Sequence, residues 1–247
     1  MLIISFSQHL DFLTGGNYEF TLDHYISIIS SESLHIIDYL KNSLTVASVT
    51  SFFVLLVASL SAYAITRISF PGRRLIPLLT LGISIFPQIS IIGYLYKWAG
   101  KLGLINTYFA LILPYLAWTL PLAFWILISY FSQIPQELDK AALIDGADRK
   151  KILWRIVLPL ATPGLLSCFL LVFIACFNEF LFALMLTSDY RAQTISVGIS
   201  LFQGLHGEIP WGELMAASFF VTSPLIILTL IFQRFIVEGL TRGAIKG

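Results

Sequence analysis

The stretch LGLINTYFALILPYLAWTLPLAFWILISYFSQIPQ, residues 102–136, contains no Asp, Glu, Lys or Arg. A helix needs about 20 apolar residues to cross ~30 Å of hydrocarbon, so this stretch is long enough to span a membrane. Four further windows have the same property, namely 42–66, 75–96, 156–178 and 214–233. The pattern predicts an all-α, polytopic membrane helix bundle with five visible transmembrane helices, placed near 43–66, 75–96, 108–131, 162–186 and 214–236.

The composition supports lipid as the solvent of this chain. It is 57% hydrophobic and 12% charged, whereas soluble domains are roughly 45–50% apolar and about 25% charged. A soluble fold this apolar would expose large hydrophobic patches. Short alternating strands are missing, so helices are favoured over a barrel. Cys168 and Cys176 lie in one apolar run without nearby His or Cys, and we interpret them as small hydrophobic residues. The net charge of +1 does not indicate nucleic-acid binding.

Helix breakers occur inside several predicted spans. Such residues persist at membrane depth where neighbouring helices or a wet cavity satisfy the freed backbone. They indicate either ordinary kinks or a bundle with an internal pathway, and the sequence leaves both open. The breakers are Pro77, Gly82, Pro87, Gly93, Pro114, Pro121 and Pro224.

Basic residues predict the orientation of the spans. Of the 15 Lys and Arg, most follow the first or third span or end the chain, and only Lys41, Lys97, Lys101 and Arg191 lie on the opposite side. The positive-inside rule places the larger group, and with it the C-terminus, in the cytoplasm. That group comprises Arg67, Arg73, Arg74, Lys140, Arg149, Lys150, Lys151, Arg155, Arg234, Arg242 and Lys246.

The same rule places residues 1–42 outside, as a periplasmic segment preceding a transmembrane domain over 43–247. Residues 1–40 contain no Lys or Arg, which agrees with that location. Met1–Phe6 is apolar but too short to span, and it lacks the basic region of a signal peptide. We expect Met1–Ser7 to be the remnant, or outer end, of a missing or divergent first helix. The alternative is that this segment is translocated unaided.

The connection SQIPQELDKAALIDGADRKKILWRIVLPLATP, residues 132–163, predicts two short helices. Pro135 suits a first helical turn, and Glu137 and Asp139 favour a helix N-terminus. Gly146 should end this helix, and a second should run from near Asp148 to Val157. Pro159 and Pro163 then mark the return to the membrane. Four residues can form an apolar stripe, namely Leu138, Ala141, Ala142 and Ile144. From these residues alone, the element either docks in a groove of a partner protein or lies flat in the headgroup region.

This connection resembles the EAA loop of binding-protein-dependent ABC permeases. The pattern is Glu-Ala-Ala, three residues, Gly, nine residues, Ile, one residue, Leu-Pro. Ala141, Ala142, Gly146, Ile156, Leu158 and Pro159 fall on these spacings, and Asp145 and Ala147 flank the glycine as in the common form. The one departure is Lys140, which stands where the motif has Glu.

The resemblance extends over about residues 20–247 and is closest to maltose-type sugar permeases of the second-subunit class. It rests also on Asn42-Ser43-Leu44, Ala62-Tyr63-Ala64, Phe70-Pro71-Gly72-Arg73, Asn178-Glu179-Phe180, Phe202-Gln203-Gly204 and the C-terminal Gly239–Gly247. Members normally have six helices. The resemblance implies a bacterial or archaeal inner-membrane subunit that forms half of a translocation pathway for a sugar or related solute. It implies a heterodimer with a second permease subunit, two ATPase subunits and an extracytoplasmic solute-binding protein.

The resemblance also assigns a coupling role to the loop, in which Lys140 to Arg155 form the element that contacts the ATPase. The chain has no G-x-x-x-x-G-K-[ST] sequence, so we expect no nucleotide site of its own. ATP and Mg²⁺ should be bound by the partner ATPase, and this chain should be no enzyme. The expected coupling residues are Lys140, Ala141, Ala142, Asp145, Gly146, Ala147, Ile156, Leu158 and Pro159.

Two further sites are expected. Glu179 is the one acidic residue inside a span, and a charge facing lipid costs about 2.5–3.5 kcal/mol, so it should face the bundle or a wet cavity. It either lines the translocation path with Asn178 or pairs with another helix. In the resembling permeases, the loop over 188–213 meets the binding protein. Gln203, Gly204, His206, Gly207 and Trp211 are its candidate contacts here.

A secondary transporter or channel is the alternative function, and an intramembrane enzyme is a second. The first would need ionisable relays or discontinuous repeats at depth, and the second needs two convergent catalytic groups. Glu179 is the only carboxylate inside a predicted span, and His9, His24, His35 and His206 all lie outside the spans. Neither alternative explains the element over 132–163.

Overall fold

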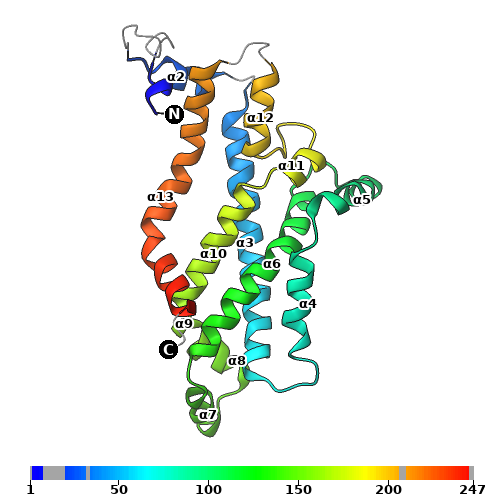
Figure 1. Cartoon of the computed structure of the whole chain (residues 1–247), viewed down its shortest axis with the longest axis vertical. Helices are drawn as coiled ribbons and strands as arrows, with labels where there is room; N and C mark the ends of the chain where they lie inside the picture. The colour runs from blue at the N-terminus through cyan, green and yellow to red at the C-terminus, as the bar shows by residue number, and fades with distance from the viewer. Residues whose placement is uncertain (1, 8–19, 32–33, 206–209, 245–247) are drawn as a thin grey trace. The chain divides into compact units, whose positions relative to one another are not determined.

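A computed structural model of the chain describes residues 2–7, 20–31, 34–205 and 210–244 (Figure 1). Within these residues, three helices are long and apolar enough to cross a membrane: α3 (Ile36–Arg67), α6 (Tyr108–Gln133) and the Trp211–Gln233 part of α13 (Trp211–Ala244). The shorter elements are α1 (Leu2–Ser5), α2 (Asp23–Ser30), α4 (Leu75–Ser84), α5 (Gln88–Lys101), α7 (Gln136–Ile144), α8 (Arg149–Ile152), the π-helix η2 (Leu153–Val157), α9 (Leu158–Leu160), α10 (Thr162–Phe177), α11 (Leu181–Leu186) and α12 (Ile195–Leu205).

The predicted all-α membrane fold is confirmed. Among the described residues, the β-structure is an isolated bridge between Ser7 and Phe20. The number of spans rises from three to five if each of two broken helix pairs counts as one. One pair is α4 with α5, and the other is Arg149–Leu160 with α10.

The single helix predicted across 75–96 is wrong in detail, because the chain leaves the helical path over Ile85–Pro87. Proline has no N–H to donate, and its ring crowds both the preceding residue and the carbonyl four residues earlier. Helix α4 therefore ends before Pro87, and α5 begins immediately after it at Gln88.

The single helix predicted across 162–186 is also wrong. Helix α10 ends at Phe177, residues 178–180 are not helical, and α11 starts at Leu181. No Pro or Gly lies at this break. The broken backbone is instead stabilised by the carboxylate of Glu179, which accepts hydrogen bonds from the N–H groups of Phe182 at 2.9 Å and Ala183 at 3.3 Å.

Contacts within the chain group it into two compact units. The first comprises Met1–Val46, Ile91–Leu111 and Phe177–Leu228, and the second comprises Ala47–Ser90, Ile112–Cys176 and Thr229–Gly247. Helices α3, α6 and α13 each contribute residues to both units. The second unit contains α7, α8, η2 and α9, so the connection over 132–163 is described within one unit.

The second unit has a closely packed core. Leu127, Phe131, Ile152 and Val157 are fully buried, and so is the thiol of Cys168. Gly164 of α10 lies against the Tyr130 ring of α6, and a Cβ atom added at Gly164 would overlap that ring. Glycine is therefore required here by space, since its φ is not positive.

We expect Gly164→Ala to destabilise the protein, although Ala normally favours a helix over Gly by about 1 kcal/mol. Overpacking against Tyr130 should cost about 1–3 kcal/mol, and the apparent melting temperature of the detergent-purified complex should fall by a few degrees. The matched control is Gly82→Ala in α4, where an added Cβ meets nothing within 4 Å. Equal melting of the two variants would contradict the packing argument.

Candidate functional site

Helix α7 ends in a hydrogen-bond pattern that fixes the turn after it. The N–H of Gly146 donates to the carbonyl of Leu143 at 3.1 Å, and the N–H of Ala147 donates to the carbonyl of Ala142 at 2.9 Å. These are the two bonds of a Schellman motif, which requires a left-handed residue at its centre. Gly146 has φ +81°, as the motif demands. The predicted helix stop at Gly146 is confirmed.

The second arm of the connection begins with a capped helix. The side chain of Asp148 accepts a hydrogen bond from the N–H of Lys151 at 2.8 Å, which satisfies one of the free donors of α8. The chain then widens into η2, where the N–H of Leu158 bonds to the carbonyl of Leu153. Pro159 follows at once, and it cannot donate to the carbonyl of Arg155. The predicted helix from near Asp148 to Val157 is confirmed, with this π-helical end added.

The connection returns to a long helix through a sharp bend. The stretch Arg149–Leu160 and helix α10 are bent by 77° at Ala161. Ile156 and Leu158 are half-buried in this bend, whereas Pro159 is exposed. The nine residues predicted to couple therefore divide into two groups. Lys140, Ala141, Ala142, Asp145, Gly146 and Ala147 lie on α7 and its terminal turn, and Ile156, Leu158 and Pro159 lie in the bend.

The outward side of α7 is apolar and uncovered. Of the predicted apolar stripe, Leu138 is exposed and Ile144 is 86% exposed. Lys140 and Ala141 are exposed beside them, and Ala142 is half-buried. Within the described chain, nothing covers this stripe. A partner groove or a headgroup layer could cover it, because exposed apolar surface of this kind marks an interaction site.

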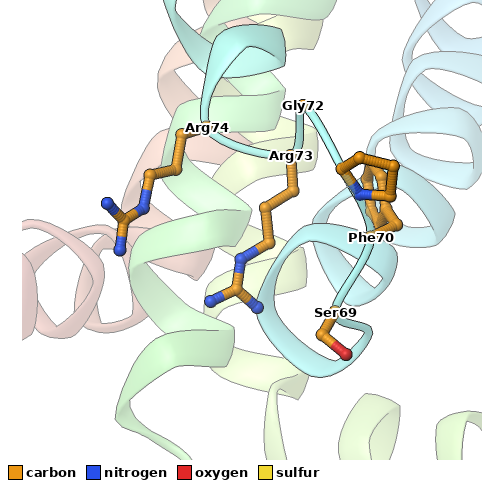
Figure 2. Close-up of a pocket in the computed structure, with 6 residues that line it drawn as sticks. Ser69, Phe70, Gly72, Arg73 and Arg74 are labelled. Carbon is orange, nitrogen blue, oxygen red and sulfur yellow. The ribbon is translucent and has the colours of Figure 1, made fainter.

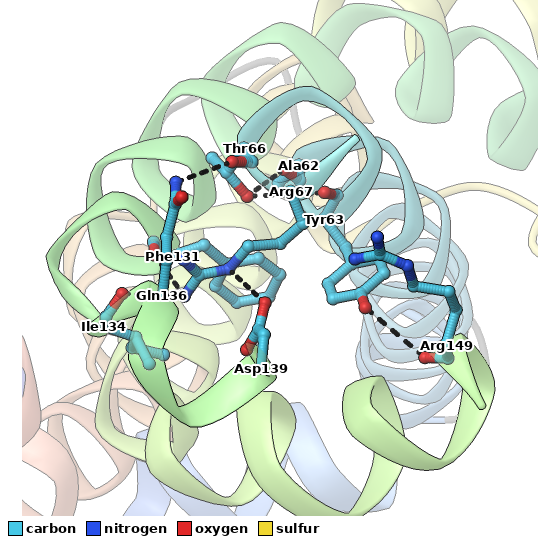
Figure 3. Close-up of polar contacts among 9 residues, drawn as sticks. All are labelled: Ala62, Tyr63, Thr66, Arg67, Phe131, Ile134, Gln136, Asp139 and Arg149. Atoms are coloured by element: carbon cyan, nitrogen blue, oxygen red, sulfur yellow. Dashed lines mark hydrogen bonds and ion pairs between the residues drawn. The ribbon is translucent and has the colours of Figure 1, made fainter. Parts of the chain in front are cut away.

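The inward side of α7 carries a buried ion pair (Figure 3). Asp139 Oδ2 lies 3.2 Å from Nε of Arg67, the last residue of α3. The side chains are 1% exposed for Arg67 and 6% for Asp139. The Nη2 of Arg67 also donates to two carbonyls, of Phe131 at 3.2 Å and Ile134 at 2.8 Å. Arg67 thus joins α3 to the end of α6, to the linker and to α7.

A buried ion pair of this kind fixes the relative position of α3 and α7 more than it adds to the free energy of unfolding. Removing one partner of a buried pair costs roughly 3–5 kcal/mol because the other charge is left uncompensated, yet two apolar residues in its place are often neutral. The pair is also incompletely satisfied, since Asp139 Oδ1 and Arg67 Nε are both buried without a hydrogen-bond partner. The sequence predicts Asp139 only as an acid favouring a helix N-terminus, and its pairing with Arg67 was not predicted.

Two further residues of α3 hold the connection (Figure 3). The hydroxyl of Tyr63 lies 3.4 Å from the carbonyl of Arg149, the first residue of α8. Nε2 of Gln136, the first residue of α7, lies 3.5 Å from the carbonyl of Thr66. The last turn of α3 therefore contacts both arms of the connection.

The turn after α3 forms an open pocket of about 550 Å³ (Figure 2). Its lining comes from one short segment, Ser69 to Arg74, and Figure 2 shows the Arg73 and Arg74 side chains extending from that turn. Gly72 has φ +81°, which the turn requires. The pocket has no residue in common with the predicted site residues.

The predicted path residues lie at the break between α10 and α11. Asn178 is exposed, whereas Glu179 is 5% exposed and its carboxylate accepts the two backbone hydrogen bonds that cap α11. The burial of Glu179 agrees with the expectation that it faces the bundle or a wet cavity, and its predicted roles in lining the path or pairing with another helix stay predictions. The structure shows a further role that was not predicted, the stabilisation of a broken helix.

Polar side chains of the first unit hold the segment that follows α11. The amide of Asn42 donates to the carbonyls of Tyr190 at 2.8 Å and Gln193 at 2.9 Å, and the hydroxyl of Tyr108 donates to its Oδ1 at 2.6 Å. The hydroxyl of Ser43 accepts from the N–H of Ile195 at 2.8 Å. The start of α3 therefore fixes the backbone between α11 and α12.

Asn106 stabilises the same segment. Its side-chain oxygen accepts from the N–H groups of Ser188 and Asp189 at 3.1 and 3.3 Å. A hydrogen bond from the Asn106 side chain, and then one from the N–H of Arg191, hold the pKa of the exposed Asp189 carboxyl below its ordinary value.

The predicted contacts for a binding protein are only partly described. Gln203 and Gly204 belong to α12, and Trp211 is 44% exposed at the start of α13. His206 and Gly207 lie outside the described residues. In the described part of the chain, no group of three His, Cys, Asp or Glu side chains is arranged to hold a metal ion.

Residues 40–242 match the family of binding-protein-dependent transport system inner membrane components. The chain belongs to this family. It is therefore a multi-pass permease subunit of an ATP-driven importer that works with a solute-binding protein, and its ATPase is a separate subunit. The proposed EAA-loop resemblance lies inside the matched residues.

Named relatives are similar over most of this permease. It is 56% identical to the trehalose/maltose transport system permease protein MalG of Thermococcus litoralis, covering 100% of this chain and 90% of the relative. It is 40% identical to the trehalose transport system permease protein SugB of Mycobacterium tuberculosis, covering 92% and 82%. It is 37% identical to the inner membrane ABC transporter permease protein YcjP of Escherichia coli, covering 93% and 81%.

Solved transporters have the same fold. A chain of a bacterial ABC transporter that imports the acidic polysaccharide alginate superposes with a TM-score of 0.78 at 20% identity, covering 94% of this permease and 87% of that chain. A chain of the MetNI methionine ABC transporter superposes with a TM-score of 0.66 at 15% identity, covering 85% and 99%. At these identities the likeness concerns the fold alone.

We expect Gly146→Ala to loosen the turn after α7, because a left-handed backbone costs an L-residue roughly 1–2 kcal/mol. Exchange of the amide hydrogens of Gly146 and Ala147 should quicken by roughly 5- to 30-fold in the purified permease. Gly146→Asn is the control, since Asn tolerates this conformation and a Cβ atom meets nothing within 4 Å there. Equal exchange in the two variants would show that φ does not limit the turn.

Proposed function

We propose that this permease imports a disaccharide of the trehalose or maltose kind. The observation that carries the proposal is the 56% identity to a trehalose/maltose permease across the whole chain. The similarity to a trehalose permease at 40% identity supports the same substrate class. Methionine and alginate transporters share the fold at 20% identity or less and so carry no weight for the solute.

The proposal includes a complete assembly. This chain pairs with a second permease subunit, and the two bind two ATPase subunits and receive solute from an extracytoplasmic binding protein. ATP and Mg²⁺ bind to the ATPase subunits, since this chain has no phosphate-binding loop sequence. The side rich in Lys and Arg faces the cytoplasm, together with the loop over 132–163 and the C-terminus.

In this proposal the exposed stripe of α7 docks in a groove of the ATPase. Leu138 and Ile144 supply apolar surface that the described chain leaves uncovered. The exposed Lys140 brings a positive charge to the edge of that contact, where the family motif has an acid. We therefore expect the facing edge of the ATPase groove to be acidic or neutral.

The remaining assignments follow from exposure. The exposed Asn178 lines the solute path, and the capped Glu179 keeps the helix broken beside it. Gln203, Gly204, His206, Gly207 and Trp211 meet the binding protein, with Trp211 presenting an exposed ring.

Docking through α7 is tested by Ile144→Glu. A carboxylate placed in an apolar contact should weaken ATPase binding by about tenfold or more, and less ATPase should co-purify with the permease. Ile68→Glu is the matched control, because Ile68 is 38% exposed in the turn after α3. Undiminished co-purification of Ile144→Glu would refute docking through this stripe.

The solute is tested with the reconstituted complex and its binding protein. Trehalose or maltose should stimulate ATP hydrolysis and drive uptake several-fold, whereas methionine should do neither. Omission of ATP should abolish uptake. Stimulation by neither disaccharide would refute the proposed substrate class while leaving the importer itself intact.

A further inference from the structure

The last turn of α3 is the place where the coupling loop is held within its unit (Figure 3). Arg67 reaches α7 through Asp139, and Tyr63, one turn earlier, reaches α8 through the carbonyl of Arg149. The loop is therefore attached at both arms to consecutive turns of one helix. A displacement of the loop has to move this turn or break these contacts.

Helix α7 presents opposite chemistry on its two sides. Asp139 is its buried charged residue, whereas Ile144, five residues on and so about 140° around the helix, is exposed. The apolar stripe offers contact that is non-directional. The guanidinium of Arg67 donates from Nη2 to the carbonyls of Phe131 and Ile134, which fixes the plane of the group and holds Nε 3.2 Å from the Asp139 carboxylate. The apolar side therefore suits a partner that binds and dissociates. The side with the ion pair fixes the position of α7 relative to the end of α3.

The helix that receives this contact is uninterrupted. Helix α3 contains neither Pro nor Gly over Ile36–Arg67. The other two long helices contain Pro inside the helix, at Pro114 and Pro121 in α6 and at Pro224 in α13. Pro removes a backbone hydrogen bond and kinks a helix. Among these three helices, α3 is therefore expected to bend least when its C-terminal end is displaced.

We propose that Arg67 and Asp139 are a positioning pair that makes α7 and the end of α3 move together when the ATPases close. The proposal rests on the proposed docking of α7 to the ATPase. It adds a route inside the permease, from the docked helix through one ion pair into a transmembrane helix. Neither residue contacts solute or nucleotide in this role.

The test compares wild type with the double variant Arg67→Met/Asp139→Leu in the assembled complex. Removing both charges avoids a lone buried ion, so this variant is expected to fold and to retain the α7 stripe. Hydrogen exchange is measured with and without a non-hydrolysable ATP analogue. In wild type, the analogue should change exchange by about fivefold or more both in α7 and in the Ala62–Arg67 turn. In the double variant, the analogue should still change hydrogen exchange in α7, whereas exchange in the Ala62–Arg67 turn should change by less than about twofold.

The control is Glu137→Gln, which removes an exposed carboxylate from the same helix and should behave as wild type. If the double variant does not assemble, Asp139→Asn carries the same comparison with an intermediate response. An unchanged response of the turn in an assembled charge-removed variant overturns the positioning role. Failure of the wild-type chain to bind the ATPase refutes the docking proposal instead, so the two failures are distinguishable.

Discussion

Hydrocarbon offers no hydrogen-bond partner to a peptide group, and each interruption of a helix in this chain has to be satisfied by the chain itself. The break between α10 and α11 is satisfied by the Glu179 carboxylate, which accepts from two backbone N–H groups. The segment after α11 is satisfied by side chains of Asn42, Ser43 and Asn106. Polar side chains are therefore found where the backbone leaves the helical path, both in the break at Glu179 and in the segment after α11.

Helix α3 supports loops at both of its ends. At its start, Asn42 and Ser43 bind the backbone between α11 and α12 within the first unit. At its end, Tyr63 and Arg67 contact both arms of the connection over 132–163 within the second unit. A 32-residue helix without Pro or Gly suits these contacts at both ends, because each contact depends on side chains held by a regular helical backbone.

Much of the fold could be predicted because its signals are local. Charge-free windows identify the spans, and Gly146 identifies the end of α7 because only a residue tolerant of positive φ suits that turn. Pro87 is a local signal too, yet a single helix was predicted across it where the structure has a break. The break at Glu179 carries no Pro or Gly, so its cause is a side chain folding back onto the backbone, which no periodicity reports. The Arg67–Asp139 pair joins residues far apart in sequence, and neither differs in type from the exposed charges around it.

Asp139 and Lys140 show how adjacent charges acquire different roles. Successive helical residues point about 100° apart, so one of the two can face α3 while the other faces outward. Asp139 is buried against Arg67, and replacing it disturbs the permease itself. Lys140 is exposed, so its departure from the family motif leaves the fold of α7 unaffected. An exposed charge at the edge of an interface affects partner choice and association rate more than affinity. In the proposed docking of α7, Lys140 therefore bears on which ATPase this permease accepts.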